Sequence, residues 1–201
     1  MTFRQSDATN VVMPQIETIL TADMSRADAL AIAELLIRIW PRPGVTVEDR
    51  ADKLQTNRGD QNPPPEIASR SFVIRDAGRV IGHALVFPRT IGTTAGEMTI
   101  AALGSVCTDP NYRGQKLGER LVQSAWRGVD EGLLPFSLFQ TSQTAKQFYD
   151  RFGCLLVENQ VTDSTAEDPT ACPFKDDHIV RYPGRNRDWP TGPIDLRGPG
   201  Y

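Results

Sequence analysis

The stretch V-C-T-D-P-N-Y-R-G-Q-K-L-G, Val106 to Gly118, decides the fold prediction, because an apolar strand end turns through Pro110 and opens onto an amphipathic helix. The first four backbone N–H groups of a helix have no partner within it, and the peptide dipoles place partial positive charge there. Gly114 allows close approach of the backbone to a ligand oxygen. Three side chains with donor groups surround the same helix end: Arg113, Gln115 and Lys116. Phosphates bind such ends, so we expect an anion cradle suited to a pyrophosphate.

The composition predicts one globular domain, since 201 residues with 39% hydrophobic content can bury a sizeable core. Twenty-two Lys and Arg against 25 Asp and Glu leave a net charge of −3, and no basic run interleaved with aromatic residues occurs. We therefore expect no general nucleic-acid surface, while a local basic pocket stays open. No apolar stretch is long enough to span a membrane, so no membrane association is expected.

Cysteine usage and the first residues predict a cytoplasmic protein. The segment MTFRQSDATN, residues 1–10, lacks the apolar core of a signal peptide. The cysteines, Cys107, Cys154 and Cys172, are odd in number and lack the spacing of metal ligands. We expect reduced thiols and no bound metal ion.

Hydrophobic periodicity predicts a sheet with helices on both faces around the cradle. The predicted strands are Ser71–Asp76, Arg79–Phe87, Gly96–Thr108, Pro135–Phe139, Cys154–Val161 and His178–Tyr182. The predicted helices are Met24–Trp40, Thr46–Leu54, Leu117–Gly132 and one that Ser142 caps and Gly153 ends. Gly104 is predicted to mark a bulge just before the cradle. Residues 1–182 form the expected domain, and 183–201 form a Pro/Gly-rich tail that is either disordered or docked on the domain or a partner chain.

Two motifs at their mutual spacing resemble the GNAT superfamily of acyl-CoA-dependent N-acyltransferases. The first, R-G-Q-K-L-G from Arg113 to Gly118, is similar to the superfamily's R/Q-x-x-G-x-G/A cofactor motif after a strand. The second, S-Q-T-A-K-Q-F-Y-D-R-F-G-C from Ser142 to Cys154, is similar to its second helix, which carries a Tyr near its end. The element order resembles the superfamily over roughly residues 16–182. The resemblance implies a mixed α/β (α+β) fold with a mostly antiparallel, centrally splayed sheet.

The resemblance also implies an activity, the transfer of an acetyl group from acetyl-CoA directly to an amine, with no covalent enzyme intermediate. The main chain of Val106, Cys107 and Thr108 would bind pantetheine and polarise the thioester carbonyl. The turn Arg113, Gly114, Gln115, Lys116, Leu117 and Gly118 would bind pyrophosphate. Tyr149 would protonate the departing thiolate, and Ser142 stands where relatives often have a cofactor-contacting Asn.

Two positions depart from the superfamily's pattern. Lys116 replaces the first motif glycine, and we interpret it as tolerated within the first helical turn at ordinary helical dihedrals, where its ammonium group could meet a phosphate. Ala102 occupies a strand position at which many relatives carry a carboxylate base. Glu97, His83 or a water chain could serve instead, although plain alternation along the strand places Glu97 on the opposite face unless a bulge intervenes.

Plainer interpretations stay open for three of these residues. Tyr149 could simply pack in the core beside Phe148, and Ser142 could act only as a helix N-cap. Cys107 is better explained as a small buried hydrophobe than as a nucleophile, because no His lies near it.

The acceptor is predicted to be a small-molecule amine, with a protein N-terminus or lysine as the second choice. A non-catalytic acyl-CoA sensor or scaffold of the same fold is the alternative, motivated by Lys116 and Ala102. A homodimer is left open.

Overall fold

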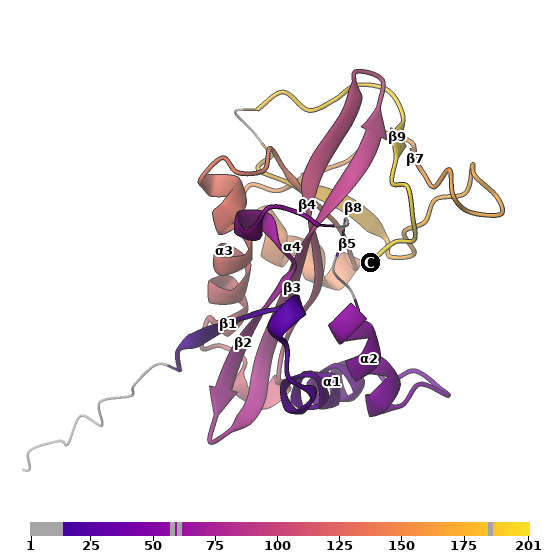
Figure 1. Cartoon of the computed structure of the whole chain (residues 1–201). Coiled ribbons are helices and arrows are strands. Elements are labelled where there is room, and N and C mark those ends of the chain that lie inside the picture. Colours follow the sequence, from indigo (N-terminus) through magenta and orange to yellow (C-terminus); the bar gives the residue numbers. More distant parts are fainter. Residues whose placement is uncertain (1–13, 57–58, 60–61, 185–186) are drawn as a thin grey trace, which may run out of the picture.

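A twisted sheet organises the computed structural model, which describes residues 14–56, 59, 62–184 and 187–201 (Figure 1). Within these residues the strands are β1 Ile16–Leu20, β2 Arg70–Asp76, β3 Arg79–Thr93, β4 Gly96–Thr108, β5 Ser137–Thr141, β6 Leu155–Leu156, β7 Val161–Thr162, β8 His178–Tyr182 and β9 Ile194–Asp195. Their order is β1-β2-β3-β4-β5-β8-β6, and β9 pairs with β3 and β7. The β4–β5 and β7–β9 pairs are parallel and the other pairs are antiparallel, which confirms the mostly antiparallel mixed sheet.

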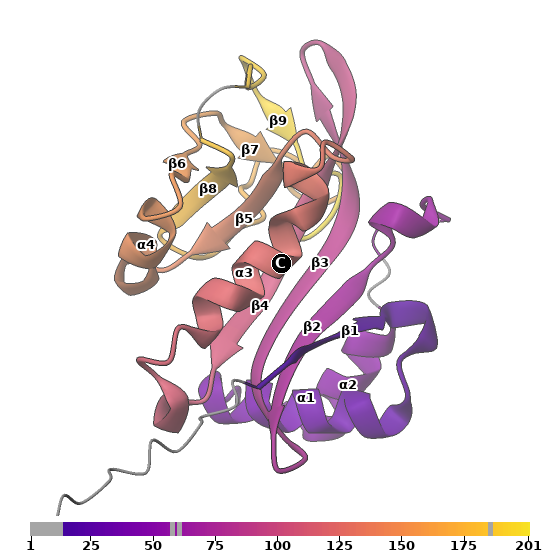
Figure 2. The same ribbon diagram turned by 90° about the vertical axis from the view of Figure 1, so that its left-hand side faces the viewer.

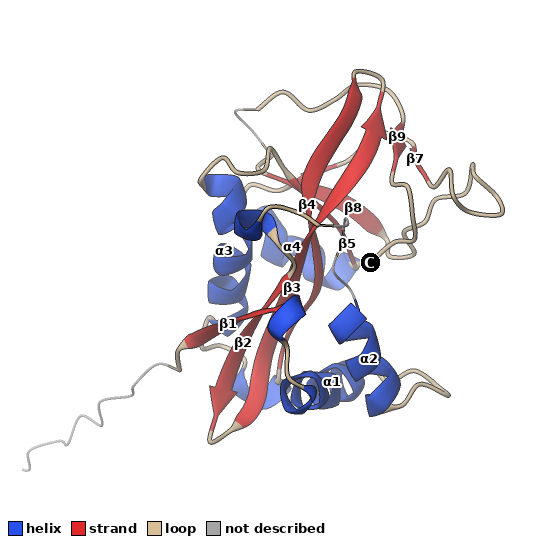
Figure 3. Cartoon of the chain, viewed as in Figure 1, coloured by secondary structure: helices blue, strands red, loops and turns tan. Residues whose placement is uncertain are grey.

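Four α-helices cover this sheet in the described residues (Figure 3). They are α1 Arg26–Ile39, α2 Val47–Thr56, α3 Leu117–Asp130 and α4 Gln143–Asp150, with 3-10 turns at Thr21–Asp23, Pro65–Ile67 and Pro110–Tyr112. Figure 1 shows α3 on one side of the sheet and α1 with α2 on the other. Helices on both faces were predicted. Because helices cover both faces of the sheet, nine consecutive residues of β3, from Val80 to Pro88, are buried.

Helix ends follow their local sequence signals. The Ser25 hydroxyl accepts a hydrogen bond from the Asp28 N–H and so caps α1, which stops just before Pro41. The Ser142 hydroxyl likewise caps α4 by accepting from the Ala145 N–H. Gly132, with φ 79°, takes the left-handed conformation that follows α3.

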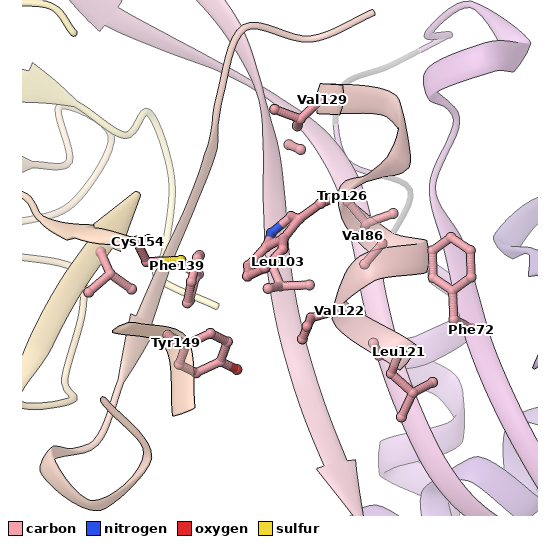
Figure 4. Packing of buried hydrophobic residues seen from close by; sticks show 14 of the residues in the cluster. Phe72, Val86, Leu103, Leu121, Val122, Trp126, Val129, Phe139, Tyr149 and Cys154 are labelled. Carbon is pink, nitrogen blue, oxygen red and sulfur yellow. The ribbon is translucent and has the colours of Figure 1, made fainter. Parts of the chain in front are cut away.

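The face of the sheet under α3 and α4 carries the larger aromatic core (Figure 4). The Trp126 ring stacks on Tyr182 at a centroid distance of 4.0 Å and contacts Phe139 at 6.0 Å. The inward residues of α3 recur at helical spacing: Leu117, Leu121, Val122, Ala125, Trp126 and Val129. This burial fixes α3 to the sheet and thereby fixes the position of its N-terminus.

Three predicted strands differ from the structure, and one of them is β3, which continues past its predicted end at Phe87 to Thr93. The segment Cys154–Val161 was expected to form one strand, yet only Leu155–Leu156 and Val161–Thr162 pair. The Asn159 amide between them donates to the carbonyl groups of Pro190 and Gly192, which draws the segment away from β8 and toward the tail. The strand predicted over Pro135–Phe139 starts at Ser137 instead.

The segment 183–201 lies on the domain where the structure describes it. Ile194 and Leu196 are fully buried, and β9 pairs with β7 and, at Gly92, with β3. The Tyr201 ring packs edge-on against Phe87 and Phe174. Of the alternatives predicted for this tail, the structure therefore shows the docked one.

Candidate active site

A splay between β4 and β5 opens the centre of the sheet, where α3 lies in front of the two strands in Figure 2. Pairing between them is confined to Ala101 with Ser137 and Ala102 with Leu138. Beyond these pairs β4 stays bound to β3 as far as Thr108, whereas β5 follows β8. The edge of β4 after Ala102 therefore presents main-chain groups that no neighbouring strand of the described chain takes up.

A β-bulge shapes this exposed edge. Leu85 pairs with Gly104 and His83 with Cys107, so one extra residue of β4 lies between the two pairs. Ser105 in this interval has φ 53°, in the left-handed region. The predicted bulge is confirmed immediately after Gly104, and it re-aims the main chain that leads into Val106 and Thr108.

His83 supports the bulge from the neighbouring strand, β3. Its Nδ1 lies 3.0 Å from the Ser105 carbonyl oxygen and its Nε2 lies 2.9 Å from the Ser71 hydroxyl. A carbonyl only accepts, so Nδ1 carries the hydrogen and Nε2 accepts from Ser71. Complete burial lowers the pKa of His83 to about 4, although its bond to Ser105 partly opposes the shift. With both nitrogens engaged inside the protein, His83 is a support of β4 and has no free nitrogen for a substrate.

Asp109 anchors the turn that follows β4. Its carboxylate is 1% exposed and accepts from Arg38 at 3.0 Å and from Arg79 at 3.1 Å. The same side chain accepts from the Asn111 N–H at 3.0 Å and begins the 3-10 turn. Two guanidinium groups and a backbone donor thus fix the chain between the splay and α3, a feature that sequence reasoning missed because both cations come from distant segments.

The turn into α3 has the predicted cradle shape, with one correction. Gly114 has φ 81°, a conformation that glycine adopts without strain. Lys116 is the N-cap residue with φ 58° and ψ 20°, and its side chain makes no capping bond. The expectation of ordinary helical dihedrals at Lys116 is therefore wrong. The left-handed conformation disfavours a side chain by about 1 kcal/mol, which explains why glycine is suited to this position.

The N-terminus of α3 faces the same region. The first intrahelical bond runs from the Arg120 N–H to the Lys116 carbonyl, so the backbone N–H groups before Arg120 have no partner within the helix. Arg113, Gly114, Gln115 and Lys116 are exposed around it. A Cβ at Gly118 would lie 3.6 Å from the Phe148 ring and 3.8 Å from the Thr108 methyl group. These are ordinary contact distances, so the packing of α4 and β4 here does not itself require a glycine. The donor set of the cradle suits a bound diphosphate.

Tyr149 lies on α4 at the splay side of the aromatic core. It is 7% exposed and packs against Phe139 at a centroid distance of 4.7 Å. Figure 4 shows its hydroxyl directed toward the strand that carries Leu103. Burial, followed by the charges of Cys154 and Cys107, raises the pKa of Tyr149 above its usual range. The phenol therefore keeps its proton at neutral pH, as an acid must.

The other predicted candidates occupy less suitable places. Cys107 is buried, and burial raises the pKa of its thiol to about 12, so it is a neutral core residue. Ala102 is buried at the start of the splay and brings no carboxylate. Glu97 pairs with Arg197 at 2.7 Å at the hairpin end of β4, about 26 Å along the strand from Ser105. Neither Glu97 nor His83 thus presents a base to the splay.

A cleft of about 340 Å³ opens onto the splay from the face that α1 and α2 cover. Gly104 and Ser105 of β4 and Gln140 of β5 form its floor. Its walls come from α2, from the link between α1 and α2, and from residues 173–176 and 199–201. The residues that line this cleft are far apart in the chain.

Two kinds of feature are absent from the described part of the chain. No group of three or more His, Cys, Asp or Glu residues there could hold a metal ion. No described helix has the length and apolarity that a transmembrane span requires.

Part of the chain matches a known domain. The model of the GNAT acetyltransferase domain matches residues 68–153, which include the splay, the cradle and Tyr149. No curated protein matches the chain in sequence.

Several solved structures share the fold. The Escherichia coli GNAT family N-acetyltransferase YhbS, solved in complex with CoA, has a TM-score of 0.60 at 16% identity, over 96% of this chain and 93% of that one. A GNAT family acetyltransferase from Staphylococcus aureus gives 0.56 at 14% identity, over 83% and 98%. An acyl-CoA N-acyltransferase from Pseudomonas aeruginosa gives 0.54 at 15% identity, over 84% and 99%. These likenesses show that the chain has the GNAT fold, and residues 68–153 match the GNAT acetyltransferase domain.

Proposed function

We propose that the protein is an acyltransferase that moves the acetyl group of acetyl-CoA to the amine of a small molecule. The observation that carries the proposal is the meeting of three features at one place. The splay between β4 and β5 has the free N-terminus of α3 at one side and the 340 Å³ cleft at the other. An acyl donor and an acceptor can therefore reach one gap from opposite faces of the sheet.

The cradle would hold the diphosphate of the donor. The N–H groups at the start of α3 point outward, and Arg113 and Lys116 add positive charge. The pantetheine arm would then run along the exposed edge of β4 at Val106 to Thr108. Main-chain N–H groups at the bulge would stabilise the negative charge that develops on the thioester oxygen during attack.

Tyr149 would supply the proton for the leaving group. The reaction forms a C–N bond, breaks the C–S bond and leaves a thiolate that needs a proton. Tyr149 is buried beside the splay and its raised pKa keeps the phenol protonated until then. The phenol is the group that the resemblance assigns to this role, and its position supports the assignment.

The amine must lose a proton before it attacks, and Asp176 is suited to assist. Its carboxylate is the only one among the described residues that line the cleft. The Asp176 N–H donates to the Gln140 side chain at 2.9 Å, which fixes this residue against β5. We propose that Asp176 attracts the ammonium form and passes its proton to solvent water.

The size of the cleft supports a small-molecule acceptor, and the free thiols support a cytoplasmic location. A cavity of about 340 Å³ suits a small molecule. Cys107, Cys154 and Cys172 are free thiols, as expected for a protein that works in the reducing cytoplasm beside its acyl donor.

A Tyr149→Phe variant separates this function from a non-catalytic acyl-CoA sensor, which Lys116 and Ala102 favour. Thiol release from acetyl-CoA is measured over a panel of small amines, and acetyl-CoA affinity is measured by calorimetry. We expect wild-type turnover, a fall in kcat of at least about tenfold in Tyr149→Phe, and unchanged affinity.

The matched control is Tyr182→Phe, because the Tyr182 hydroxyl bonds to Asp130 at the opposite end of α3 from the cradle. It should keep the wild-type rate. Saturable acetyl-CoA binding by the wild type, with no thiol release for any amine, would support the sensor instead.

A further inference from the structure

The acceptor cleft carries an unusual concentration of positive charge. Four cationic side chains line it: Arg42, Arg50, Lys53 and Lys175. The one described acidic side chain in the lining is Asp176. The whole chain has a net charge of −3, so this local excess runs against the overall balance.

None of these four cations forms an ion pair with a described residue. Elsewhere on α1 and its neighbours, arginines are paired: Arg26 contacts Asp52, Arg38 contacts Asp109, and Arg75 contacts Glu17 and Asp28. Glu17, Asp28, Asp52 and Asp109 are thus directed to other cations, and the described ion pairs leave the four cations of the cleft unpaired.

Arg50 gives the clearest sign of a missing partner. Its Nη2 donates to the Trp40 carbonyl at 3.3 Å, while its Nε is buried and has no hydrogen-bond partner. Desolvation and then the like charge of Arg42 lower the pKa of Arg50 below its usual value. Two adjacent guanidinium groups, one with an unsatisfied buried donor, form an arrangement that an oxyanion stabilises through forked hydrogen bonds.

We propose that the acceptor is an amine that also bears an anionic group, a carboxylate or a phosphate, which Arg42 and Arg50 bind with help from Lys53 and Lys175. This inference rests on the proposed function and names its substrate class. Lys175 is held in place because its N–H donates to the Gln140 side chain at 2.7 Å. The anion would lie toward α2, and the amine would lie toward Asp176, Ser105 and the splay.

The test uses pairs of amines that differ only in the anion: β-alanine against β-alaninamide, and O-phosphoethanolamine against ethanolamine. Each is assayed for thiol release with saturating acetyl-CoA. We expect the anionic member of at least one pair to have a kcat/KM at least about tenfold higher, which corresponds to one charge-assisted hydrogen bond. The pair that shows the preference tells carboxylate from phosphate.

Variants assign the preference to this cleft. In Arg50→Gln, and more so in Arg42→Gln/Arg50→Gln, the ratio of anionic to neutral kcat/KM should fall toward one. Arg127→Gln is the matched control, because Arg127 lies on α3 with its side chain 78% exposed and pairs with Glu131. It should keep the wild-type ratio.

A ratio at or below one in the wild type, or no turnover of any of these amines while acetyl-CoA binds, would overturn the inference. A ratio that Arg42→Gln/Arg50→Gln leaves unchanged would overturn it too. Turnover of the neutral amines without preference for the anionic ones would leave the proposed function standing. Absence of acetyl-CoA binding by the wild type would overturn both.

Discussion

The two sides of the splay are built in different ways. The cradle side consists of one continuous stretch, Val106 to Gly118, whose strand end, turn and helix start supply backbone donors. The cleft side is assembled from α1, the link between α1 and α2, α2, β3, β4, β5, residues 173–176 and residues 199–201, and it presents mainly side chains. A diphosphate common to all donors can be bound by backbone geometry, whereas an individual acceptor needs a particular set of side chains. Donor binding thus depends on the backbone of the shared fold, whereas acceptor specificity depends on the side chains of the cleft.

The largest expected effect tests the strand that both sides share. His83 supports the β4 bulge in its neutral form, and burial lowers its pKa from 6.5 to about 4. Because the folded pKa is below the unfolded value, the unfolded state binds the proton first as the pH falls. His83 should therefore reduce the free energy of unfolding as the pH falls from about 6.5 to about 4, by about 3 kcal/mol in total.

The measurement is denaturant unfolding of the wild type and His83→Gln between pH 7 and pH 4. Carboxylates contribute equally to both proteins, so the difference between the two curves isolates His83. Glutamine does not titrate, and the variant's loss of stability should be smaller. Parallel pH profiles would show that the bulge does not depend on a neutral His83.

The second-largest effect should come from a change at Tyr201 and should concern only the cleft side of the splay. The Tyr201 hydroxyl donates to the Leu138 carbonyl at 2.9 Å, and its ring packs between Phe87 and Phe174. Tyr201→Ala removes these contacts from a half-buried position and should lower the free energy of unfolding by about 2 kcal/mol. Turnover should fall as the cleft wall is lost, while acetyl-CoA affinity stays within twofold.

Thermal unfolding, calorimetry and thiol release on the same preparation check this prediction. Tyr201→Phe is the control, since it keeps the ring contacts and loses only the hydroxyl. If Tyr201→Ala weakened acetyl-CoA binding as strongly as turnover, the two sides of the splay would not be separable.

The smallest effect should fall on the cradle side alone. Lys116 adopts φ 58°, which a side chain disfavours and glycine does not. Lys116→Gly should raise the free energy of unfolding by up to about 1 kcal/mol, measured by chemical denaturation. Gly114→Ala is the reverse case, because it places a Cβ at φ 81°, and it should destabilise by about the same amount.

The Lys116→Gly variant also tells whether the ammonium group meets a phosphate. If it does, acetyl-CoA affinity falls although the fold gains stability. Equal stability of Lys116→Gly and the wild type would mean that the left-handed conformation carries no cost at this position.

The features predictable from sequence were the local ones. The cap at Ser142, the bulge after Gly104 and the turn at Gly114 depend on neighbours within a few residues, and the pattern predicted each correctly. The short strand at Val161 was misjudged because Asn159 is bound by the tail, a contact over about thirty residues. The left-handed Lys116 was missed because a lysine there runs against residue preference.

The candidate site divides along the same line. The cradle and Tyr149 were found because their spacing resembles a family. Asp176, Gln140 and the two cleft arginines, Arg42 and Arg50, belong to no motif. Arg42 and Arg50 line the same cleft as Gln140 only in the folded chain, since about a hundred residues separate them in sequence. Sequence reasoning also kept His83 and Glu97 as candidate bases, and only their partners in the fold, Ser71 and Arg197, show that they are engaged elsewhere.

Calorimetric titration with acetyl-CoA tests the central claim, that the donor binds at the cradle, most directly. Wild type, Arg113→Glu and Arg127→Glu are compared at two salt concentrations, since the two variants carry the same charge change near opposite ends of α3. We expect saturable binding by the wild type, a loss of at least about tenfold for Arg113→Glu, and wild-type affinity for Arg127→Glu. No binding at millimolar acetyl-CoA, or equal weakening by both variants, would contradict donor binding at the cradle.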